Sequence, residues 1–270
     1  MIPGLSSSTE ARLRAMLDGR VTDLDDQTLA ERRPDLFAGR DEAARQLGLE
    51  MQGTGPDVTL VVSDPSRRLG NIRVETGGQD NLLFFDNVTW TGNFHANIRI
   101  LGSGCVLFFL DIGNEYVALP DVFLRSNGQF LFWGTGTSAV GCNIELEGEG
   151  QGVVIGDDGM LSSGVWIRNH DMHAMYDLGT GALISRPPVT TVVERHVWIG
   201  QDALLLSCER VGTGSIIGAR ALVKGVVGPC LVAAGTPART IRNDVSWGRD
   251  TYGMSARERV SLGLPAEPES

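Results

Sequence analysis

The stretch VERHVWIGQDALLLSCERVGTGSIIGARALV, residues 193–223, repeats with a strict period of six. Branched aliphatic residues occupy every sixth position, and they are Val193, Ile199, Leu205, Val211, Ile217 and Val223. An amphipathic helix repeats near 3.6 residues and a half-buried strand repeats near 2, so neither explains this spacing. A period of six instead predicts a stacked parallel coil whose short flat faces each turn one aliphatic side chain inward.

The same period extends upstream with one interruption. Ile155, Leu161 and Ile167 step by six, but the 26 residues from Ile167 to Val193 are not a multiple of six. We therefore expect a loop excursion over residues 168–192 that leaves the coil and returns to it. Its polar side chains indicate a functional loop on a rigid frame, and they are Arg168, Asn169, His170, Asp171, His173, Tyr176, Asp177 and Arg186.

A looser repeat precedes the hexads. Four segments of the form apolar-x-apolar-x-x-x-Gly start 26, 24 and 22 residues apart, at Ile72, Ile98, Val122 and Ile144. Each is followed by an apolar run: LLFF (82–85), VLFF (106–109), FLFW (130–133) and VVI (153–155). This period is typical of a solenoid, in which stacked units share one core. We expect the Phe and Trp side chains of these runs to belong to that core.

The chain divides into three parts by composition. Residues 1–55 are rich in helix formers and poor in glycine, so they predict a small helical appendage with one helix after Ser8-Thr9-Glu10 and another over AARQLGLEM (43–51). Residues 56–243 predict a mostly β solenoid domain. Residues 244–270 form a charged tail in which we expect a short helix.

Charge and cysteine usage exclude several classes of protein. The 33 acidic residues outnumber the 23 basic ones, which gives a net charge of −10 and argues against a nucleic-acid partner. The four cysteines form no CxxC pair, so neither a zinc site nor a redox pair is expected, and reduced thiols fit a cytoplasmic protein. The N-terminus lacks the apolar core of a signal peptide, and the longest apolar runs are too short for an integral membrane segment.

Three C-terminal segments resemble the hexapeptide-repeat acyltransferases: VWIG (197–200), VGTGSIIGARALV (211–223) and AAGTPARTIR (233–242). The loop HDMHAMYDLGTGALI (170–184) is similar to the sugar O-acetyltransferases of that family, which act on capsule, exopolysaccharide or lipopolysaccharide units. The resemblance implies a left-handed parallel β-helix and a homotrimer that binds acetyl-CoA between subunits and a carbohydrate acceptor, with no metal. The handedness rests on the resemblance alone, because crossover connections are ordinarily right-handed.

The resemblance also implies catalytic residues in the excursion. His173 falls at the position of the family's catalytic histidine, and an imidazole suits the removal of a proton from a sugar hydroxyl at neutral pH. Asp171 or Asp177 would orient the ring, although either could equally serve a turn. His170 is the alternative base. His196, outside the excursion, is expected at a corner or a subunit contact.

Three residues match positions at which family members contact the coenzyme: Ala219, Lys224 and Arg239. Gly218 and Ala219 would let the backbone approach the donor closely, and Lys224 or Arg239 would meet its phosphates. Trp198 would lie against the pantetheine arm or the acceptor, or it would simply pack as an aromatic side chain. The chain departs from the family pattern at Ser207-Cys208, Thr236 and VKGVVGPC (223–230).

Two other functions remain open on the sequence. The same fold also carries N-acyltransferases, which act for example on amino sugars, and fold alone does not decide function. A catalytically silent β-helix that serves as a scaffold or binding module is the other alternative. The presence of His173 in a polar loop argues against the scaffold.

Overall fold

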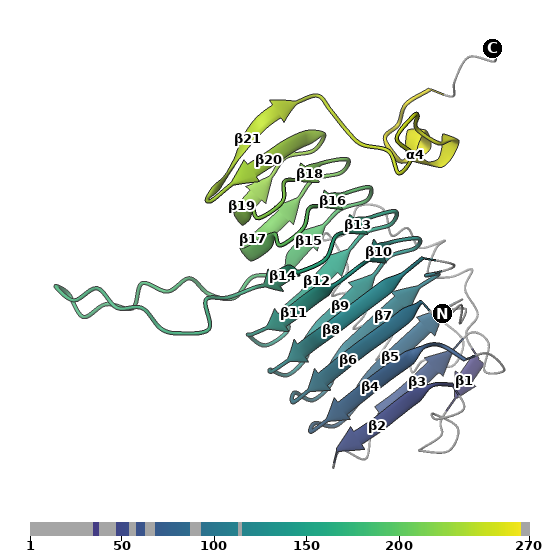
Figure 1. Ribbon diagram of the computed structural model, residues 1–270. Coiled ribbons are helices and arrows are strands. Elements are labelled where there is room, and N and C mark those ends of the chain that lie inside the picture. The colour runs from purple at the N-terminus through teal and green to yellow at the C-terminus, as the bar shows by residue number, and fades with distance from the viewer. Residues whose placement is uncertain are drawn as a thin grey trace.

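The computed structural model describes residues 35–37, 47–53, 58–62, 68–86, 93–112 and 115–265. Its strands stack into a solenoid that runs the length of the molecule, with the C-terminal strands at one end (Figure 1). Neighbouring coils pair in parallel along three faces, as a left-handed parallel β-helix requires. The predicted fold class is therefore confirmed.

The first face pairs strands from successive coils in parallel. It consists of β2 (Leu49–Gly53), β4 (Asn71–Thr76), β6 (Phe94–Ile100), the end of β8 (Val117–Leu124), β11 (Cys142–Leu146), β14 (Val165–Arg168), and the starts of β17 (Leu204–Val211) and β19 (Leu222–Val227).

The second face follows the first around each corner. It consists of β3 (Val58–Val62), β5 (Asn81–Asp86), β7 (Val106–Leu110), β9 (Phe130–Trp133), β12 (Gly152–Ile155), β15 (Thr191–Val193) and the ends of β17 and β19. At its N-terminal end β1 (Asp35–Phe37) pairs antiparallel with β3.

The third face has the shortest strands. It consists of the start of β8, β10 (Ser138–Ala139), β13 (Met160–Leu161), β16 (Trp198–Ile199), β18 (Ile216–Ile217) and β20 (Leu231–Gly235). Strand β21 (Ala238–Asn243) pairs antiparallel with β20 and ends the coil. The two-residue strands of this face are what leaves room for a complete coil in about eighteen residues.

The hexad residues form the inner stack of the last coils. All six predicted aliphatics, Val193 to Val223, are 0–1% exposed. Upstream, the predicted ladder Ile98, Val122 and Ile144 is also in register. Ile72 instead pairs with Ala96, two residues before Ile98, so the first repeat is 24 residues long. Buried residues of β4 pair with buried residues of β6, which excludes a slip by one residue, whereas a slip by two residues would keep the same faces.

Aromatic side chains fill the N-terminal coils. Phe85 and Phe109 stack inside the solenoid with ring centroids 5.2 Å apart, and Trp133 is fully buried beyond them. This confirms the prediction that these runs belong to the core. The outer sides of the same strands carry a second buried cluster, in which Phe84 and Phe108 stack at 4.4 Å.

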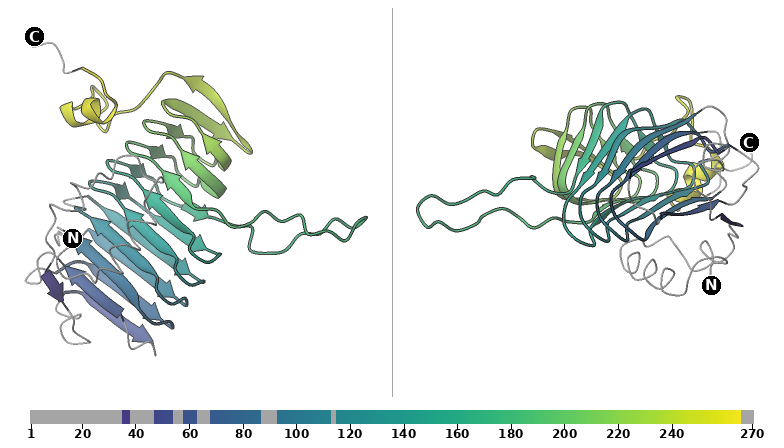
Figure 2. Two further views of the ribbon diagram at one scale, coloured as in Figure 1. Left: turned by 180° about the vertical axis from the view of Figure 1, so that it is seen from behind. Right: turned by 90° about the horizontal axis from the view of Figure 1, so that it is seen from below.

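The interruption of the hexads is a projecting hairpin. Strand β14 ends at Arg168 and β15 begins at Thr191, so the excursion of residues 169–190 lies within the predicted 168–192. It extends away from the side of the solenoid, from the corner between the first and second faces (Figures 1 and 2).

The two ends differ in how well they match the predictions. The coil already begins at β2, so the helix predicted over AARQLGLEM is wrong for residues 49–51, where Leu49 is buried and Glu50 is exposed as in a strand. The helix predicted after Ser8 lies outside the described residues. Near the C-terminus α4 (Ala256–Ser261) is the expected short helix, and Ser255 and Glu258 form its capping box. In the part of the chain that is described, no helix is long and apolar enough to cross a membrane.

Candidate active site

Backbone hydrogen bonds and one serine hydroxyl hold the excursion as a hairpin. Tyr176 and Leu183 form an antiparallel bridge, and the Asp177 N–H donates to the Ala182 carbonyl at 2.8 Å. Ser185 Oγ accepts from the Met175 N–H at 2.6 Å and donates to the His173 carbonyl at 3.3 Å. The backbone around His173 is therefore tied to the returning strand of the hairpin.

The His173 imidazole is exposed on this hairpin. Among the described residues no side chain or backbone group hydrogen-bonds to its ring. The two carboxylates predicted to orient the ring have other partners: Asp171 contacts Lys224, and Asp177 binds backbone N–H groups of the hairpin tip. The ring is thus available to groups outside its own coil.

Asp177 shapes the tip of the hairpin. Its Oδ1 accepts hydrogen bonds from the Gly179 N–H at 3.0 Å, the Thr180 N–H at 2.7 Å and the Thr180 hydroxyl at 2.8 Å. The Thr180 hydroxyl and these backbone groups hold the pKa of Asp177 below its ordinary value. Its carboxylate is ionised at neutral pH and serves the turn within this chain.

His170 has a different environment from His173. It is half-buried at the root of the hairpin, and its Nδ1 accepts a hydrogen bond from the Met172 N–H at 3.0 Å. A nitrogen that accepts from a backbone N–H carries no hydrogen, so a neutral ring bears its hydrogen on Nε2. Neither nitrogen then offers a lone pair to a substrate hydroxyl, which makes His170 a poorer base than His173.

Asp171 and Lys224 are brought together at the corner from which the hairpin leaves. Lys224 Nζ lies 3.7 Å from Asp171 Oδ1, and both side chains are partly exposed. Lys224 belongs to β19, two coils beyond β14 along the first face. The contact therefore joins a residue predicted to orient the base with one predicted to hold the donor.

Gly218, Ala219 and Arg239 gather at the opposite edge of the first face. A Cβ atom on Gly218 would lie 2.8 Å from the Ala234 Cβ, so stacking of the coils requires glycine here. Arg239 is exposed and is the ladder partner of Ala234 on β21. Ala219 is exposed at the coil corner, where its small side chain leaves the backbone accessible. A small corner residue with an exposed arginine on the nearby strand β21 suits an extended donor that carries phosphates.

Trp198 lies on the third face and packs against Trp247, with ring centroids 6.2 Å apart and planes tilted by 52°. It is half-buried there. Trp198 does not contact the hairpin of its own chain. It lies in β16 on the third face, whereas Lys224 lies in β19 on the first face.

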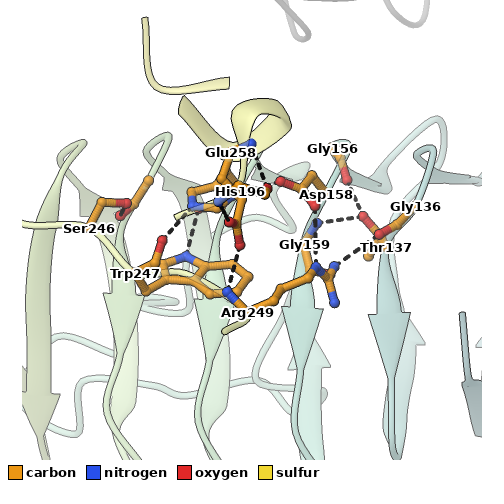
Figure 3. Close-up of polar contacts among 12 residues, drawn as sticks. Gly136, Thr137, Gly156, Asp158, Gly159, His196, Ser246, Trp247, Arg249 and Glu258 are labelled. Atoms are coloured by element: carbon orange, nitrogen blue, oxygen red, sulfur yellow. Dashed lines mark hydrogen bonds and ion pairs between the residues drawn. The ribbon is translucent and has the colours of Figure 1, made fainter. Parts of the chain in front are cut away.

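The sequence reasoning missed a polar cluster around His196 (Figure 3). His196 is fully buried at a coil corner with a φ of 53°, which agrees with the predicted corner position. Its Nδ1 lies 2.8 Å from Asp158 Oδ2, and its ring stacks on Trp247 at 4.4 Å. Trp247 and Arg249 reach this corner from beyond the coil, so no local sequence pattern could have revealed the cluster.

A pocket of about 460 Å³ lies on the second face where the hairpin returns to the coil. Its lining combines valines with polar side chains and includes none of the predicted site residues: Gln151, Val189, Thr190, Val192, Glu209, Arg210 and Val226. Arg210 is already paired with Glu194.

Two cysteines are chemically quiet. Cys142 and Cys208 are buried, and burial raises the pKa of both thiols, to about 12 for Cys208. A thiol rather than a thiolate is a poor nucleophile, so neither side chain is suited to carry an acyl group. Within the described ranges no three His, Cys, Asp or Glu side chains come together as ligands for a metal ion.

Known proteins resemble this chain over most of the solenoid, although no family model matches it. The polysialic acid O-acetyltransferase of Neisseria meningitidis is 30% identical over 173 residues, which are 62% of this chain and 78% of that protein. A second relative is WbbJ of Escherichia coli K12, which is described as a lipopolysaccharide biosynthesis O-acetyl transferase. It is 25% identical over 182 residues, which are 58% of this chain and 84% of WbbJ. The crystal structure of the polySia-specific acetyltransferase NeuO superposes with a TM-score of 0.65 at 21% identity and covers 80% of this chain and 89% of NeuO.

Proposed function

This chain belongs to the hexapeptide-repeat acetyltransferases, the family of the N. meningitidis polysialic acid O-acetyltransferase, and from that premise we propose that it transfers an acetyl group from acetyl-CoA to a carbohydrate hydroxyl. The observation that carries the proposal is the 30% identity across 78% of that relative. The acceptor class is a unit of a capsule, an exopolysaccharide or a lipopolysaccharide, as the relatives' names suggest.

His173 is the proposed general base. It accepts the proton of the acceptor hydroxyl while that oxygen attacks the carbonyl carbon of the thioester, and the proton then passes to the departing sulfur of coenzyme A. General-base assistance of this kind is worth roughly 10²–10⁴-fold in rate. The exposed ring supports the role, because nothing among the described residues occupies its lone pair. Asp171 is the proposed orienting carboxylate, and Asp177 acts through the shape of the tip.

We propose that the site forms between subunits of a homotrimer. The hairpin leaves the solenoid at the corner between the first and second faces, whereas Gly218 and Ala219 lie between β18 and β19, at the corner between the third and first faces. Large apolar side chains on the hairpin are exposed in the single chain: Met175, Tyr176, Leu178, Leu183 and Ile184. An apolar hairpin of this kind favours packing against another subunit, which would carry His173 to that subunit's donor.

The donor is proposed to lie along the last coils. Ala219 would let the pantetheine approach the corner, while Lys224 and Arg239 would meet the phosphates as charged hydrogen-bond donors. Gly218 would act indirectly, because its lack of a side chain lets the coils stack under the donor. Trp198 would contact the donor only from the third face, where Trp247 already covers part of its ring.

The alternatives differ in how they meet the family evidence. Membership among acetyltransferases disfavours a silent scaffold, since it places the chain among enzymes. N-acetylation of an amino sugar would use the same donor residues and the same hairpin. O-transfer and N-transfer differ in the acceptor group. In O-transfer the base removes the proton of a hydroxyl, whereas in N-transfer it removes a proton from an amino group that is protonated at neutral pH.

The test is a turnover assay on the purified protein with acetyl-CoA and a panel of acceptors. The panel contains capsule, exopolysaccharide and lipopolysaccharide fragments, together with matched amino sugars, and release of the coenzyme thiol is measured. We expect ester products on at least one hydroxyl acceptor, with coenzyme binding seen by calorimetry. Amide products alone would assign N-transfer, and neither turnover nor coenzyme binding would favour the scaffold.

A further inference from the structure

A row of outward side chains runs along the second face from β5 to β19. Ladder pairing places seven of them in register: Phe84, Phe108, Phe132, Val154, Val192, Arg210 and Val226. The first four are 0–2% exposed, Val192 is half-buried, and Val226 at the far end is 64% exposed. The last three line the pocket of about 460 Å³ on this face, which we call the second-face pocket. The pocket therefore opens where the burial of the row ends.

Valines form the apolar part of the second-face pocket. Val192 and Val226 belong to the row of outward side chains, and Val189 belongs to the arm of the hairpin that returns to the coil. Burial of apolar surface is favourable, so a ligand with an apolar side is held against these valines.

Hydrogen bonds within the chain hold the polar groups of the second-face pocket in place. The Thr190 hydroxyl donates to Gln151 Oε1 at 2.8 Å, which orients the carboxamide. Arg210 pairs with Glu194, whose other oxygen accepts from the Thr213 N–H at 2.7 Å and the Thr213 hydroxyl at 2.8 Å. The pocket is thus preformed, and little ordering is needed when a ligand binds.

The free polar groups of the second-face pocket match a neutral polyhydroxyl ligand. Among the described residues neither the Gln151 amide nitrogen nor the Glu209 carboxylate hydrogen-bonds to another side chain, so the pocket offers both donors and acceptors. Glu209 and Arg210 carry opposite charges, which leaves the lining without net charge. The volume lies within the ~300–1,000 Å³ that is typical of small-molecule sites. A sugar ring has hydroxyls that donate and accept, and a C–H face that packs on valine.

The second-face pocket is built partly from the hairpin that carries the proposed base. The Ser185 hydroxyl donates to the His173 carbonyl across the hairpin, and Val189 follows Ser185 by four positions on the returning arm. Four residues span at most about 14 Å, so a short oligosaccharide with one unit near His173 can place another unit in the pocket. The Val189 N–H donates to the Asn169 carbonyl at 3.2 Å, which fixes the end of this arm.

We propose that the second-face pocket binds a neutral sugar unit of the acceptor, remote in the acceptor chain from the hydroxyl that reacts. This proposal rests on the proposed function, because it takes the acceptor to be a carbohydrate. Contacts to a remote unit are equal before and during the reaction, so they lower the KM for the acceptor and leave kcat unchanged. The enzyme therefore favours acceptors of several sugar units over a single sugar.

The dependence of KM on acceptor length tests the proposal. The acceptors are fragments of one to six sugar units, cut from whichever saccharide of the turnover panel gives an ester product. In the unchanged protein the KM should fall about tenfold from one unit to six, as expected for one or two hydrogen bonds. Val226→Trp fills the pocket and should abolish this ratio. Gln151→Glu keeps the oxygen that accepts from Thr190 and removes the amide donors, so it should reduce the ratio about two- to tenfold.

Val140→Trp is the matched control. Val140 is also an exposed valine, with 60% of its surface accessible, but it follows β10 on the third face. This variant should keep the full ratio between the one-unit and six-unit KM values. Loss of the ratio in Val140→Trp as well would show a general effect of a bulky surface residue and would overturn the proposal.

Methyl NMR of valine-labelled protein measures binding without turnover. Six-unit fragments of the capsule, exopolysaccharide and lipopolysaccharide in the panel are added without coenzyme, and at least one should shift the Val192 and Val226 signals. Such shifts without turnover of any acceptor would support the pocket and contradict the proposed function. No shift with any fragment, a KM that does not depend on length, or an undiminished ratio in Val226→Trp would overturn the proposal. Dissociation of an oligomer by Val226→Trp would also overturn it, because the valines would then form a subunit contact.

Discussion

The last coils and the hairpin that interrupts them are built on opposite principles. In the coils, aliphatic side chains at every sixth position from Val193 to Val223 are 0–1% exposed, so burial of apolar surface holds the structure together. In the hairpin, residues 173–184 are exposed, and hydrogen bonds that the Asp177 and Ser185 side chains accept from backbone N–H groups set the shape. Stability and chemistry are thus located in separate segments, so a variant in one segment should leave the property of the other unchanged.

The largest expected effect is on turnover. His173→Ala should lower kcat by about 10²–10⁴-fold because it removes the proposed general base, and it should leave the melting temperature unchanged because the side chain is exposed. Steady-state kinetics and thermal unfolding measure the two outcomes. His170→Ala is the matched control from the same hairpin. A comparable loss of kcat in that variant, with activity retained in His173→Ala, would transfer the role of base to His170.

The coils should respond in the converse way. Ile217→Ala removes a fully buried side chain from the inner stack and should lower the free energy of unfolding by about 2–5 kcal/mol. Its neighbour Ile216 is on the outer side of the same two-residue strand and is only half-buried, so Ile216→Ala should cost clearly less. Denaturant unfolding of both variants measures the difference. Equal losses would mean that the inner stack is not what stabilises these coils.

A smaller effect on kinetics is expected at the contact between the hairpin and the last coils, where Asp171 meets Lys224. Lys224→Ala should raise the KM for acetyl-CoA about tenfold, as expected for one lost charged hydrogen bond to phosphate. Lys224→Arg should retain most of the affinity because it keeps the charge. Asp171→Asn should instead lower kcat with little change in the donor KM. An unchanged donor KM in Lys224→Ala would remove Lys224 from the proposed donor site.

The smallest effect is confined to the tip of the hairpin. The pKa of Asp177 is lowered by its hydrogen bonds, so the ionised carboxylate stabilises the tip above the ordinary aspartate range and this contribution is lost as the pH falls through the lowered value. Amide exchange at Gly179 and Thr180 should therefore accelerate at acid pH beyond its intrinsic pH dependence. Asp177→Asn should abolish that acid-dependent step, and a variant that keeps it would assign the step to another group.

Much of the fold was predictable because its period is local. Six-residue spacing named the inner stack residue by residue, and the break in phase after Ile167 located the excursion. The first repeats were harder to align because the apolar alternation of long strands fits more than one pairing register. Ile72 pairs with a residue two positions before the predicted partner. The strand at Leu49–Gly53 was missed because its residues are also good helix formers.

The candidate site was predictable only in its parts. The hairpin histidine and the coil-corner residues could be named from the sequence. The contact of Asp171 with Lys224 could not, because these residues are 53 positions apart and meet only when the coils stack. The polar cluster around His196 was beyond prediction for the same reason, since Arg249 reaches a carbonyl 113 residues away. No short pattern records such distances, and a buried histidine at a corner gives no signal of its partner.

Mixing two inactive variants shows whether each site is shared between two subunits. His173→Ala removes the base and Ala219→Trp blocks the proposed donor corner, so each should be inactive alone. If the hairpin of one subunit serves the coils of the next, refolding an equal mixture should restore about a quarter of the sites in a random trimer, with one functional hairpin against one functional corner. Recovery near that level is the expected result for a site shared between subunits. A mixture as inactive as its parents, although the variants assemble together, would contradict it.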